Sequence, residues 1–260
     1  PPRRGVLDAA AGCEHLSASM SERRQDPPRR GSARELAGHD PGEAIARVAM
    51  ALPPIERAYA VIRFAILRHK LLTILDLALP EAGRVLDVGC GFGLWSSYFS
   101  LVAPQRSIVG VDISERRVEV AREVKRKLGL ERNEYHVGTV EASGVEGPFD
   151  GIVVLDVLHH VAPEHQRPML EHLVSLLAPG GVLIVKDITT DSAFKLKFTE
   201  ILDRVMVGFD EPLAYRHHHD WADELEALGL STRVVRVSDV LPYPHVVLVA
   251  RRDGGPSSQR

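Results

Sequence analysis

The sequence predicts an α/β fold in which a mostly parallel sheet carries helices on both faces. The chain has 260 residues, of which 45% are hydrophobic, and this is enough to bury the core of one large domain. After Pro80, short β-branched runs alternate with helical stretches, a pattern typical of parallel sheets. The last two strand candidates are joined through Leu241-Pro242-Tyr243-Pro244, a connection that is too short for a crossover helix. These two strands should therefore pair antiparallel.

The main domain is expected at residues 81–252, with strands and helices in alternation. Strands are expected at Arg84–Val88, Ser107–Asp112, Glu134–Val137, Phe149–Leu155, Val182–Asp187, Thr232–Ser238 and His245–Ala250. Helices are expected at Leu94–Val102, Glu115–Leu128, Pro163–Leu177, Phe194–Val207 and His219–Leu228. Six of these strands should run parallel and one should be reversed.

The segments outside this domain differ in composition from it. Residues 1–41 and 253–260 show no sustained period and are rich in Pro, Gly, Ser and Arg, so we expect disordered tails. A basic arm for RNA and a true start at Met20 are the alternatives for the first tail. Residues 42–80 form a helical lead-in, broken at Pro53-Pro54, with an apolar face interrupted by basic residues. This helix either packs on the main domain or touches a membrane surface or a lipid-like substrate.

Composition excludes several classes of protein. A net charge of −3 gives no general attraction to nucleic acid, so no nucleic-acid partner is expected. The two cysteines, Cys13 and Cys90, lie in unlike contexts, which suits a reducing compartment better than a disulfide framework. We find no signal peptide and no charge-free apolar run of membrane-spanning length. The expectation is a cytoplasmic protein, with peripheral membrane contact as the alternative.

A glycine-rich turn follows the first strand of the domain. It contains Gly89, Gly91 and Gly93, and Asp87 lies inside the preceding strand. Glycines at such a turn let a ligand approach the backbone closely. The next strand ends in Asp112, where a carboxylate can accept both ribose hydroxyls of a nucleoside. The G-x-G-x-G spacing differs from the dinucleotide fingerprint and fits a nucleoside ligand that carries an amino-acid group instead of a phosphate.

These motifs resemble those of the class I S-adenosylmethionine-dependent methyltransferases, over about residues 84–250. The likeness is carried by VLDVGCGFG at 85–93, VGVDIS at 109–114, FDGIVVLDVLHHV at 149–161 and LAPGGVLIVKD at 177–187. The resemblance implies S-adenosylmethionine as cofactor, S-adenosylhomocysteine as product, and a Rossmann-like sheet of seven strands in the order 3-2-1-4-5-7-6 with one strand antiparallel. It also implies cofactor contacts from these residues: Asp87, Gly89, Cys90, Gly91, Gly93, Asp112, Ile113, Thr139, Val140, Glu141 and Asp156.

Two of these cofactor positions need comment. The family often has G-D-A-E where this chain has Gly138-Thr139-Val140-Glu141, so Thr139 replaces the Asp that usually meets the adenine amino group. Glu141, the Thr139 hydroxyl or a water could take its place, and the Val140 backbone can still meet the ring. Cys90 is expected to be a small packing residue within the loop and not a nucleophile.

Candidate catalytic residues follow the fourth and fifth strands. Asp156 is expected to face the methionine end of the cofactor, while His160 or His159 acts as the base that deprotonates the acceptor. Asp187 is a candidate substrate contact or second base. Each histidine could instead cap a helix or lie in the core with its hydrogen bonds made by protein groups. The set Asp156, His159 and His160 is similar to the E-x-x-E-H run of quinone-biosynthesis O-methyltransferases, but two positions differ and no metal is expected.

Two further segments bear on the acceptor and on metals. Residues 189–216 are expected to form a lid insertion whose apolar face, together with the lead-in helix, suggests a hydrophobic acceptor. His217, His218 and His219 are expected to mark a helix start, with Asp220 or His219 near the cap. Adjacent histidines in a regular helix or strand cannot all face one ion.

The expected activity is methyl transfer to a small, hydrophobic molecule, with O-methylation favoured. An RNA or protein methyltransferase is one alternative, although the chain lacks an N-P-P-Y-like tetrapeptide after strand four and has no appended nucleic-acid module. A cofactor-binding partner without catalysis is the other. The sequence leaves the acceptor atom and the oligomeric state open.

Overall fold

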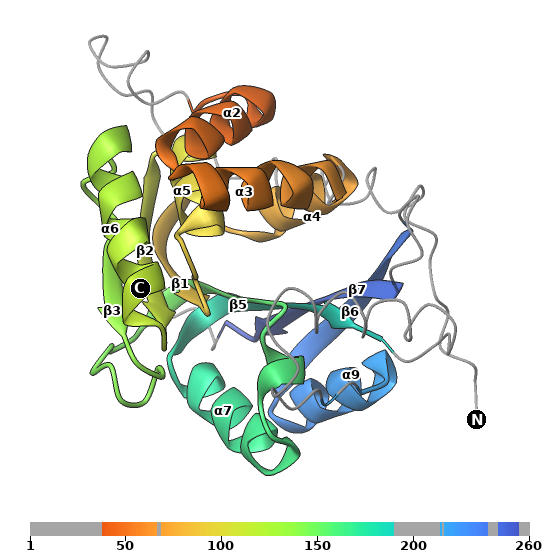
Figure 1. The fold of residues 1–260 in the computed structure, drawn as a ribbon. Coiled ribbons are helices and arrows are strands. Elements are labelled where there is room, and N and C mark those ends of the chain that lie inside the picture. The colour runs from red at the N-terminus through yellow and green to blue at the C-terminus, as the bar shows by residue number, and fades with distance from the viewer. Residues whose placement is uncertain (1–37, 67–68, 190–213, 215, 239–243, 255–260) are drawn as a thin grey trace, which may run out of the picture.

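The structure, a computed structural model, is built around a seven-stranded sheet in the order β3-β2-β1-β4-β5-β7-β6 (Figure 1). It describes residues 38–66, 69–189, 214, 216–238 and 244–254. The strands are β1 Ala82–Val88, β2 Gln105–Asp112, β3 Glu134–Val137, β4 Phe149–Leu155, β5 Leu177–Ile188, β6 Leu230–Ser238 and β7 Pro244–Arg252. The predicted strand order is confirmed.

Strand directions also agree with the prediction. β1 pairs in parallel with β2 and β4, and β5 pairs in parallel with β4. β7 is antiparallel to both β5 and β6, as the short connection between the last two strands requires. β5 begins at Leu177, five residues before its expected start, because Leu177 already pairs with Phe149 ahead of a register shift. The preceding helix accordingly ends at Ser175 and not at Leu177.

Helices cover both faces of the sheet. On one face lie α2 Pro41–Ala51, α3 Pro54–Ile66, α4 His69–Ala78 and α5 Leu94–Val102, drawn orange to yellow in Figure 1. α6 Glu115–Leu128 packs beside α5 and α2 against β2 and β3. The opposite face carries α7 Pro163–Ser175 and α9 His218–Ala227. A short 3₁₀ turn, η1 Leu158–His160, follows β4.

The core forms because alternate strand residues point to opposite faces. Val85 and Val153 join the apolar cluster beneath α2 to α5, while their neighbours Leu86 and Val154 join the cluster beneath α7 and α9. All four side chains are fully buried. Strands buried on both faces read as continuous apolar runs, which explains why they could be recognised in the sequence.

The lead-in consists of separate helices packed on the domain. α2 begins at Pro41 after Asp40, whose side chain accepts a hydrogen bond from Gly42 N at 2.9 Å, so helix starts at the last residue of the expected tail. The part of the lead-in that follows Pro53-Pro54 forms α3 and α4, with residues 67–68 between them outside the described part. Phe64 and Leu75 are among the side chains that bury these helices against the sheet.

Several predicted segments lie outside the described residues. These are most of the first tail, residues 255–260 of the second, and the helix expected at 194–207. Of the expected lid, the structure describes Thr189, Ala214 and Arg216, and Thr189 pairs with Arg216 in an isolated parallel bridge. Within the described part of the chain, no helix has the length and apolarity needed to span a membrane.

Candidate active site

The glycine loop between β1 and α5 holds three glycines in the left-handed region. The φ angles are +70° at Gly89, +53° at Gly91 and +72° at Gly93. A Cβ at Gly89 would lie 2.5 Å from Val157 Cγ2, and one at Gly93 would lie 2.9 Å from the Tyr135 hydroxyl. A Cβ at Gly91 would meet nothing within 4 Å. Gly89 and Gly93 are therefore needed for close packing, while Gly91 leaves open space where a ligand can approach the backbone.

Asp87 lies beneath this loop, almost completely buried on β1. Its Oδ2 accepts a hydrogen bond from the Ser96 hydroxyl of α5 at 2.5 Å. Burial raises the pKa of Asp87 to about 7; the bond from Ser96 opposes that shift, and the charge of Asp112 adds to it. A carboxyl group in this environment gains stability as an anion when a cationic ligand binds beside it.

Asp112 at the end of β2 fixes the loop from the other side. Its Oδ2 accepts from Gly91 N and its Oδ1 from Ser114 N, both at 2.9 Å. Ile113 follows with 75% of its surface exposed, an unusual state for a large apolar residue. Cys90 is buried under the loop, where burial raises the pKa of its thiol well above the usual value. The burial of Cys90 and its raised pKa agree with the packing role expected for it.

The turn after β3 contains Thr139, Val140 and Glu141. Thr139 is exposed, and its Oγ1 accepts a hydrogen bond from Ala142 N at 3.2 Å. Val140 is buried, and its carbonyl accepts from the Ser143 hydroxyl at 2.9 Å. Glu141 is exposed. Thr139, which stands where the family often has Asp, therefore helps to close the turn. Its hydroxyl proton can still be donated to another acceptor.

Asp156 follows β4 with φ +57°, the one residue other than glycine with positive φ in the described part of the chain. Its carboxylate contacts two cations: Lys186 Nζ of β5 and Arg63 of α3. Lys186 is almost completely buried. Sequence reasoning did not assign Lys186 or Arg63 to the site. A lysine that ends the apolar run Val182–Val185 was the available signal, because a buried cation requires a counter-ion.

His159, His160 and Asp187 come together where β4 and β5 end. His159 Nδ1 lies 2.5 Å from Asp187 Oδ1, and His159 N donates to Asp187 Oδ2 at 3.2 Å. Ile188 N donates to the same carboxylate at 2.7 Å. His160 is partly exposed as a residue although its Nδ1 is buried, and its ring centroid is 4.1 Å from that of His159. The carboxylate can only accept, so His159 carries its proton on Nδ1.

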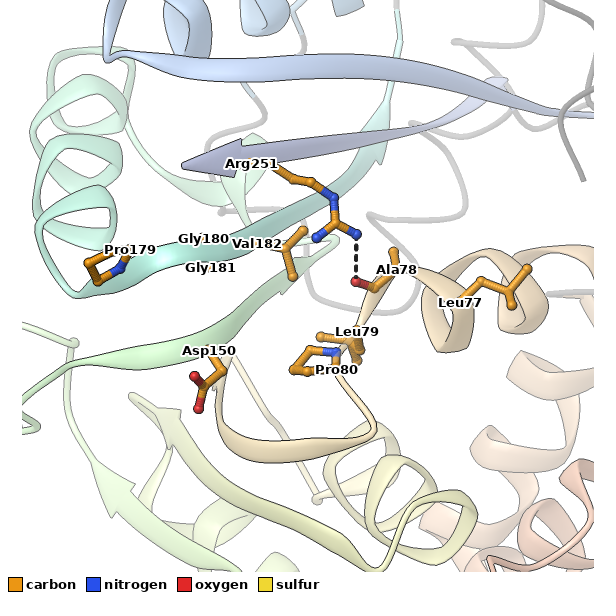
Figure 2. A pocket seen from close by; sticks show the side chains of 10 residues that line it. All are labelled: Leu77, Ala78, Leu79, Pro80, Asp150, Pro179, Gly180, Gly181, Val182 and Arg251. Carbon is orange, nitrogen blue, oxygen red and sulfur yellow. Dashed lines mark hydrogen bonds between the residues drawn. The ribbon is translucent and has the colours of Figure 1, made fainter. Parts of the chain in front are cut away.

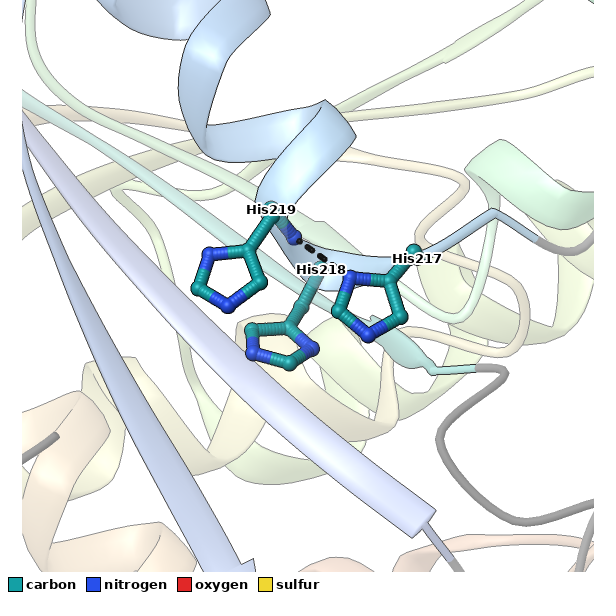
Figure 3. Close-up of side chains that lie close together, drawn as sticks. All are labelled: His217, His218 and His219. Carbon is teal, nitrogen blue, oxygen red and sulfur yellow. Dashed lines mark hydrogen bonds between the residues drawn. The ribbon is translucent and has the colours of Figure 1, made fainter. Parts of the chain in front are cut away.

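The three consecutive histidines gather at the start of α9 (Figure 3). Their ligand atoms all lie within 4.8 Å of one another, so the expectation that they cannot face one point was wrong. The cause is that His217 is the non-helical cap residue, at φ −71° and ψ 142°, and accepts from His219 N at 3.3 Å. The cluster does mark a helix start, but the helix begins at His218, one residue before the expected His219, and its cap is His217 and not Asp220 or His219.

The central histidine of this cluster is already engaged by protein groups. His218 is buried; its Nδ1 lies 3.0 Å from Thr189 Oγ1, and its Nε2 lies 3.2 Å from Arg236 Nη2. A metal ion at this ring would have to displace a guanidinium cation. We therefore assign the cluster to the helix cap and to packing beside Thr189.

A cavity of about 210 Å³ lies at the opposite edge of the sheet (Figure 2). It is lined by residues of the α4 to β1 connection, by Asp150 at the start of β4, by the turn in β5, and by Arg251, which donates to Ala78 O at 3.3 Å. The candidate site is at the carboxyl ends of the strands, where ligands bind in open α/β sheets. The cavity is therefore separate from it.

The loop and its acids fit a nucleoside with an amino-acid end. Gly91 supplies open space at the backbone, Asp112 supplies the carboxylate at the end of β2, and the exposed Ile113 supplies an apolar surface beside it. Asp87 supplies a buried carboxyl group beneath the loop, suited to a cation. These observations agree with the ligand that the sequence motifs imply.

Comparison with known proteins gives the same family. A family model described as a methyltransferase domain matches residues 59–234. Ubiquinone biosynthesis O-methyltransferase of Xanthomonas axonopodis pv. citri (strain 306) is 30% identical over 167 residues, covering 62% of this chain and 66% of that protein. The protein of the same name from Xanthomonas campestris pv. campestris (strain B100) is 32% identical over 170 residues, covering 63% and 66%. The chain thus spans just under two thirds of these relatives.

Solved structures show the same fold at low identity. The 1,6-didemethyltoxoflavin-N1-methyltransferase of Burkholderia thailandensis, with bound S-adenosylhomocysteine, has a TM-score of 0.59 at 20% identity, covering 88% of this chain and 93% of that one. The S-adenosylmethionine-dependent methyltransferase SibL has a TM-score of 0.58 at 20% identity, covering 94% and 69%. Since the matched region of the family model holds the glycine loop, Asp112 and the residues after β4 and β5, the chain belongs to the class I S-adenosylmethionine-dependent methyltransferases.

Proposed function

We propose that this methyltransferase transfers the methyl group to a hydroxyl of a small, hydrophobic molecule. The observation that carries the proposal is the group of His160, His159 and Asp187 where β4 and β5 end. Methylation of a hydroxyl needs removal of a proton, and an imidazole beside the site supplies a base for it. The names of the relatives, ubiquinone biosynthesis O-methyltransferases, support a small-molecule acceptor.

His160 is the proposed base, because it is the more exposed of the two histidines. His159 is buried and bonded through Nδ1 to Asp187, so we propose that this pair positions the adjoining His160 ring and the turn that carries it. Asp187 accepts three hydrogen bonds and is buried, which favours this positioning role over direct contact with the acceptor. The metal-binding alternative is weakened because Asp156 and His159 already contact protein cations and a carboxylate.

The cofactor supplies the methyl group as an electrophile when bound, so the chain has to hold and orient it. We propose that Asp87 and the glycine loop bind its methionine end, Asp112 its ribose, and Ile113 with the turn at Thr139, Val140 and Glu141 its adenine. Support comes from the open space at Gly91 and from the placement of Asp112 against the loop.

The proposed hydrophobic character of the acceptor rests on α3. Ile55, Val61 and Ile62 are all more than half exposed on this helix, although it is packed beside the glycine loop through Tyr59 and Phe92. Contiguous apolar patches on a protein surface mark sites that bind a ligand, a membrane or another protein. We propose a cytoplasmic enzyme whose α3 surface meets a lipophilic acceptor or the membrane that holds it.

The test is transfer of a labelled methyl group. Purified protein and methyl-labelled S-adenosylmethionine are incubated with a cell extract separated into organic-soluble, aqueous small-molecule, protein and RNA fractions. Label in the organic fraction, lost in His160→Ala while S-adenosylhomocysteine still binds, is the expected result. Label confined to RNA or protein contradicts the proposed acceptor class. Cofactor binding without transfer to any fraction indicates a non-catalytic partner.

A further inference from the structure

A buried glutamine lies on α7, the helix that follows the proposed base. The buried positions of this helix are Gln166, Leu170 and Leu173, which share one face. A third leucine at position 166 would continue the apolar stripe. The residue there is instead a polar side chain that is only 1% exposed. A buried amide costs free energy unless protein groups use its hydrogen bonds, so the partners of Gln166 indicate its role.

Two of these partners are the backbone carbonyls that flank the paired histidines. Gln166 Nε2 donates to Leu158 O and to Val161 O, both at 3.1 Å. Leu158 comes directly before His159, and Val161 comes directly after His160. A primary amide has two protons on its nitrogen, so one side chain can hold both carbonyls. Gln166 therefore holds both ends of the turn that carries the proposed base.

Arg216 sets the orientation of this amide from its other side. Arg216 Nη1 donates to Gln166 Oε1 at 3.5 Å and to Glu224 Oε2 at 2.6 Å. Its guanidinium lies 4.2 Å from the centroid of the Trp221 ring. An arginine can only donate and a carbonyl can only accept, so the amide oxygen has to face Arg216 and the NH₂ group has to face the turn. A third carbonyl, Ala214 O, lies 3.5 Å from the same nitrogen.

Asp187 and Gln166 restrain the turn η1 from two different elements. Asp187 of β5 accepts from the ring and the backbone N–H of His159, so it fixes the buried histidine. Gln166 of α7 holds the carbonyl of Val161, the residue that directly follows His160. A base has to lie within hydrogen-bond reach of the proton that it removes, and a displacement of about 1 Å can reduce a rate about a hundredfold. The backbone that carries His160 therefore has to be held firmly.

We propose that Gln166 is a positioning residue for methyl transfer: by holding Leu158 O and Val161 O, it fixes the backbone of η1 so that the His160 ring faces the acceptor. The inference rests on the proposed role of His160 in deprotonating the acceptor. A contact that only stabilises the fold is the competing explanation. The two explanations differ in one respect, because a residue that positions His160 affects the rate only while His160 is present.

The experiment is a double-mutant cycle on the rate of methyl transfer. Labelled methyl transfer to the organic-soluble fraction of the extract is measured at saturating S-adenosylmethionine for wild type, Gln166→Met, His160→Ala and the double variant. Methionine is unbranched like glutamine but lacks the amide. We expect Gln166→Met to lower the rate about tenfold or more in the wild type and less than about twofold in His160→Ala. The affinity for S-adenosylhomocysteine, measured by calorimetry, should stay within about twofold of wild type in all variants.

A second readout does not require the acceptor. The imidazole NMR signals of His160 are assigned by their loss in His160→Ala. They should shift or broaden in Gln166→Met, because the turn no longer holds the ring in one position. Unaltered His160 signals in Gln166→Met overturn the positioning role, whatever the rates show.

Arg252→Gln is the matched control. Arg252 of β7 donates to Val174 O at 3.3 Å and to Leu177 O at 2.6 Å, so its loss loosens the opposite end of α7 without touching η1. This variant should lower the melting temperature and leave the rate and the His160 signals unchanged. If Gln166→Met does not fold, Gln166→Glu takes its place, because its carboxylate keeps an acceptor for Arg216 and loses both donors for the turn.

The outcomes separate this inference from the proposed function. An equal rate loss from Gln166→Met in both backgrounds, no loss in either, or the same loss in Arg252→Gln overturns the inference and leaves the proposed function intact. An unchanged rate in His160→Ala contradicts the proposed base and the inference together. A wild type that transfers no label contradicts the proposed function, and the His160 signals then decide whether Gln166 holds the ring.

Discussion

The side chains of His159 and Asp187 form a buried pair, with 2.5 Å between His159 Nδ1 and Asp187 Oδ1. His159 belongs to the turn after β4, and Asp187 to the end of β5. The carboxylate also accepts from the backbone N–H groups of His159 and Ile188. This one side chain therefore fixes the turn, the ring and the end of the strand relative to one another.

Asp187→Asn should reduce both stability and turnover. An amide has one oxygen acceptor where the carboxylate has two, so its NH₂ group would face a backbone donor. We expect a loss of about 2 kcal/mol in the free energy of unfolding, as for a buried donor left without an acceptor. We also expect kcat to fall at least about tenfold, while the affinity for S-adenosylhomocysteine changes little. Urea unfolding, methyl-transfer rates and calorimetry measure the three quantities.

Asp150→Asn is the control for this substitution. Asp150 accepts a hydrogen bond from Arg84 N at 2.8 Å, at the opposite edge of the sheet from the candidate site. It should lower stability modestly and leave kcat unchanged. An equal fall of kcat in both variants would mean that Asp187 acts only through global stability.

Asp87 should make cofactor binding depend on pH. Its pKa is raised to about 7 by burial, so the side chain is largely protonated at pH 6 and ionised at pH 8. The positively charged methionine end of the cofactor favours the ionised form, which means that binding releases a proton near neutral pH. We expect the affinity for S-adenosylmethionine to rise between pH 6 and pH 8. Calorimetry in buffers of different ionisation enthalpy reports the released proton; identical heats in all buffers would contradict this role.

The same shift predicts that Asp87→Asn stabilises the protein without ligand at high pH. The folded pKa lies above the value of about 3.8 in the unfolded chain, so the protonated form contributes stability that is full below pH 4 and is lost as pH rises through 7. Asparagine avoids the cost of ionisation. We expect its free energy of unfolding relative to wild type to be higher at pH 8 than at pH 5, by roughly 1–3 kcal/mol. The wild type losing no stability over this range would refute the prediction.

Removal of metal should have no effect on stability. Both ring nitrogens of His218 already contact Thr189 and Arg236, so the histidine cluster at the start of α9 does not depend on an ion. We expect the melting temperature of the purified protein to be unchanged by EDTA. A lower melting temperature after chelation, restored by Zn²⁺, would assign a structural metal to the cluster.

The sheet could be predicted because its strands carry a local signal. Runs such as Ile152–Leu155 and Val182–Val185 are apolar on both faces, which is typical of buried parallel strands. The short link before β7 also set its direction. The start of β5 was missed because Leu177-Ala178-Pro179-Gly180-Gly181 has the composition of a turn, while its pairing with Phe149 depends on a neighbour distant in sequence.

The sequence predicts those site residues that can be recognised from the residue type at a single position. It does not predict contacts between residues that lie far apart in the chain. Glycines with positive φ and the carboxylate ending β2 follow from single positions. The contacts of Asp156 with Arg63 and Lys186 depend on how α3 crosses the strand ends, which no local pattern encodes. The histidine cluster was misjudged for a related reason, since regular helix geometry does not apply to the cap residue His217.

Gly91→Ala should separate the requirement for backbone conformation from the requirement for ligand space. At φ +53° an alanine costs about 1 kcal/mol in stability, and its Cβ would enter the open space at the loop. Gly129→Ala is a close match: φ is +67°, the Cβ would also meet nothing within 4 Å, and the position is the C-cap of α6, away from the loop. We expect both variants to lose similar stability and only Gly91→Ala to lose affinity for S-adenosylhomocysteine, by at least about tenfold. If Gly91→Ala binds as well as Gly129→Ala, the open space at Gly91 does not hold the cofactor, and the ligand must approach the loop elsewhere.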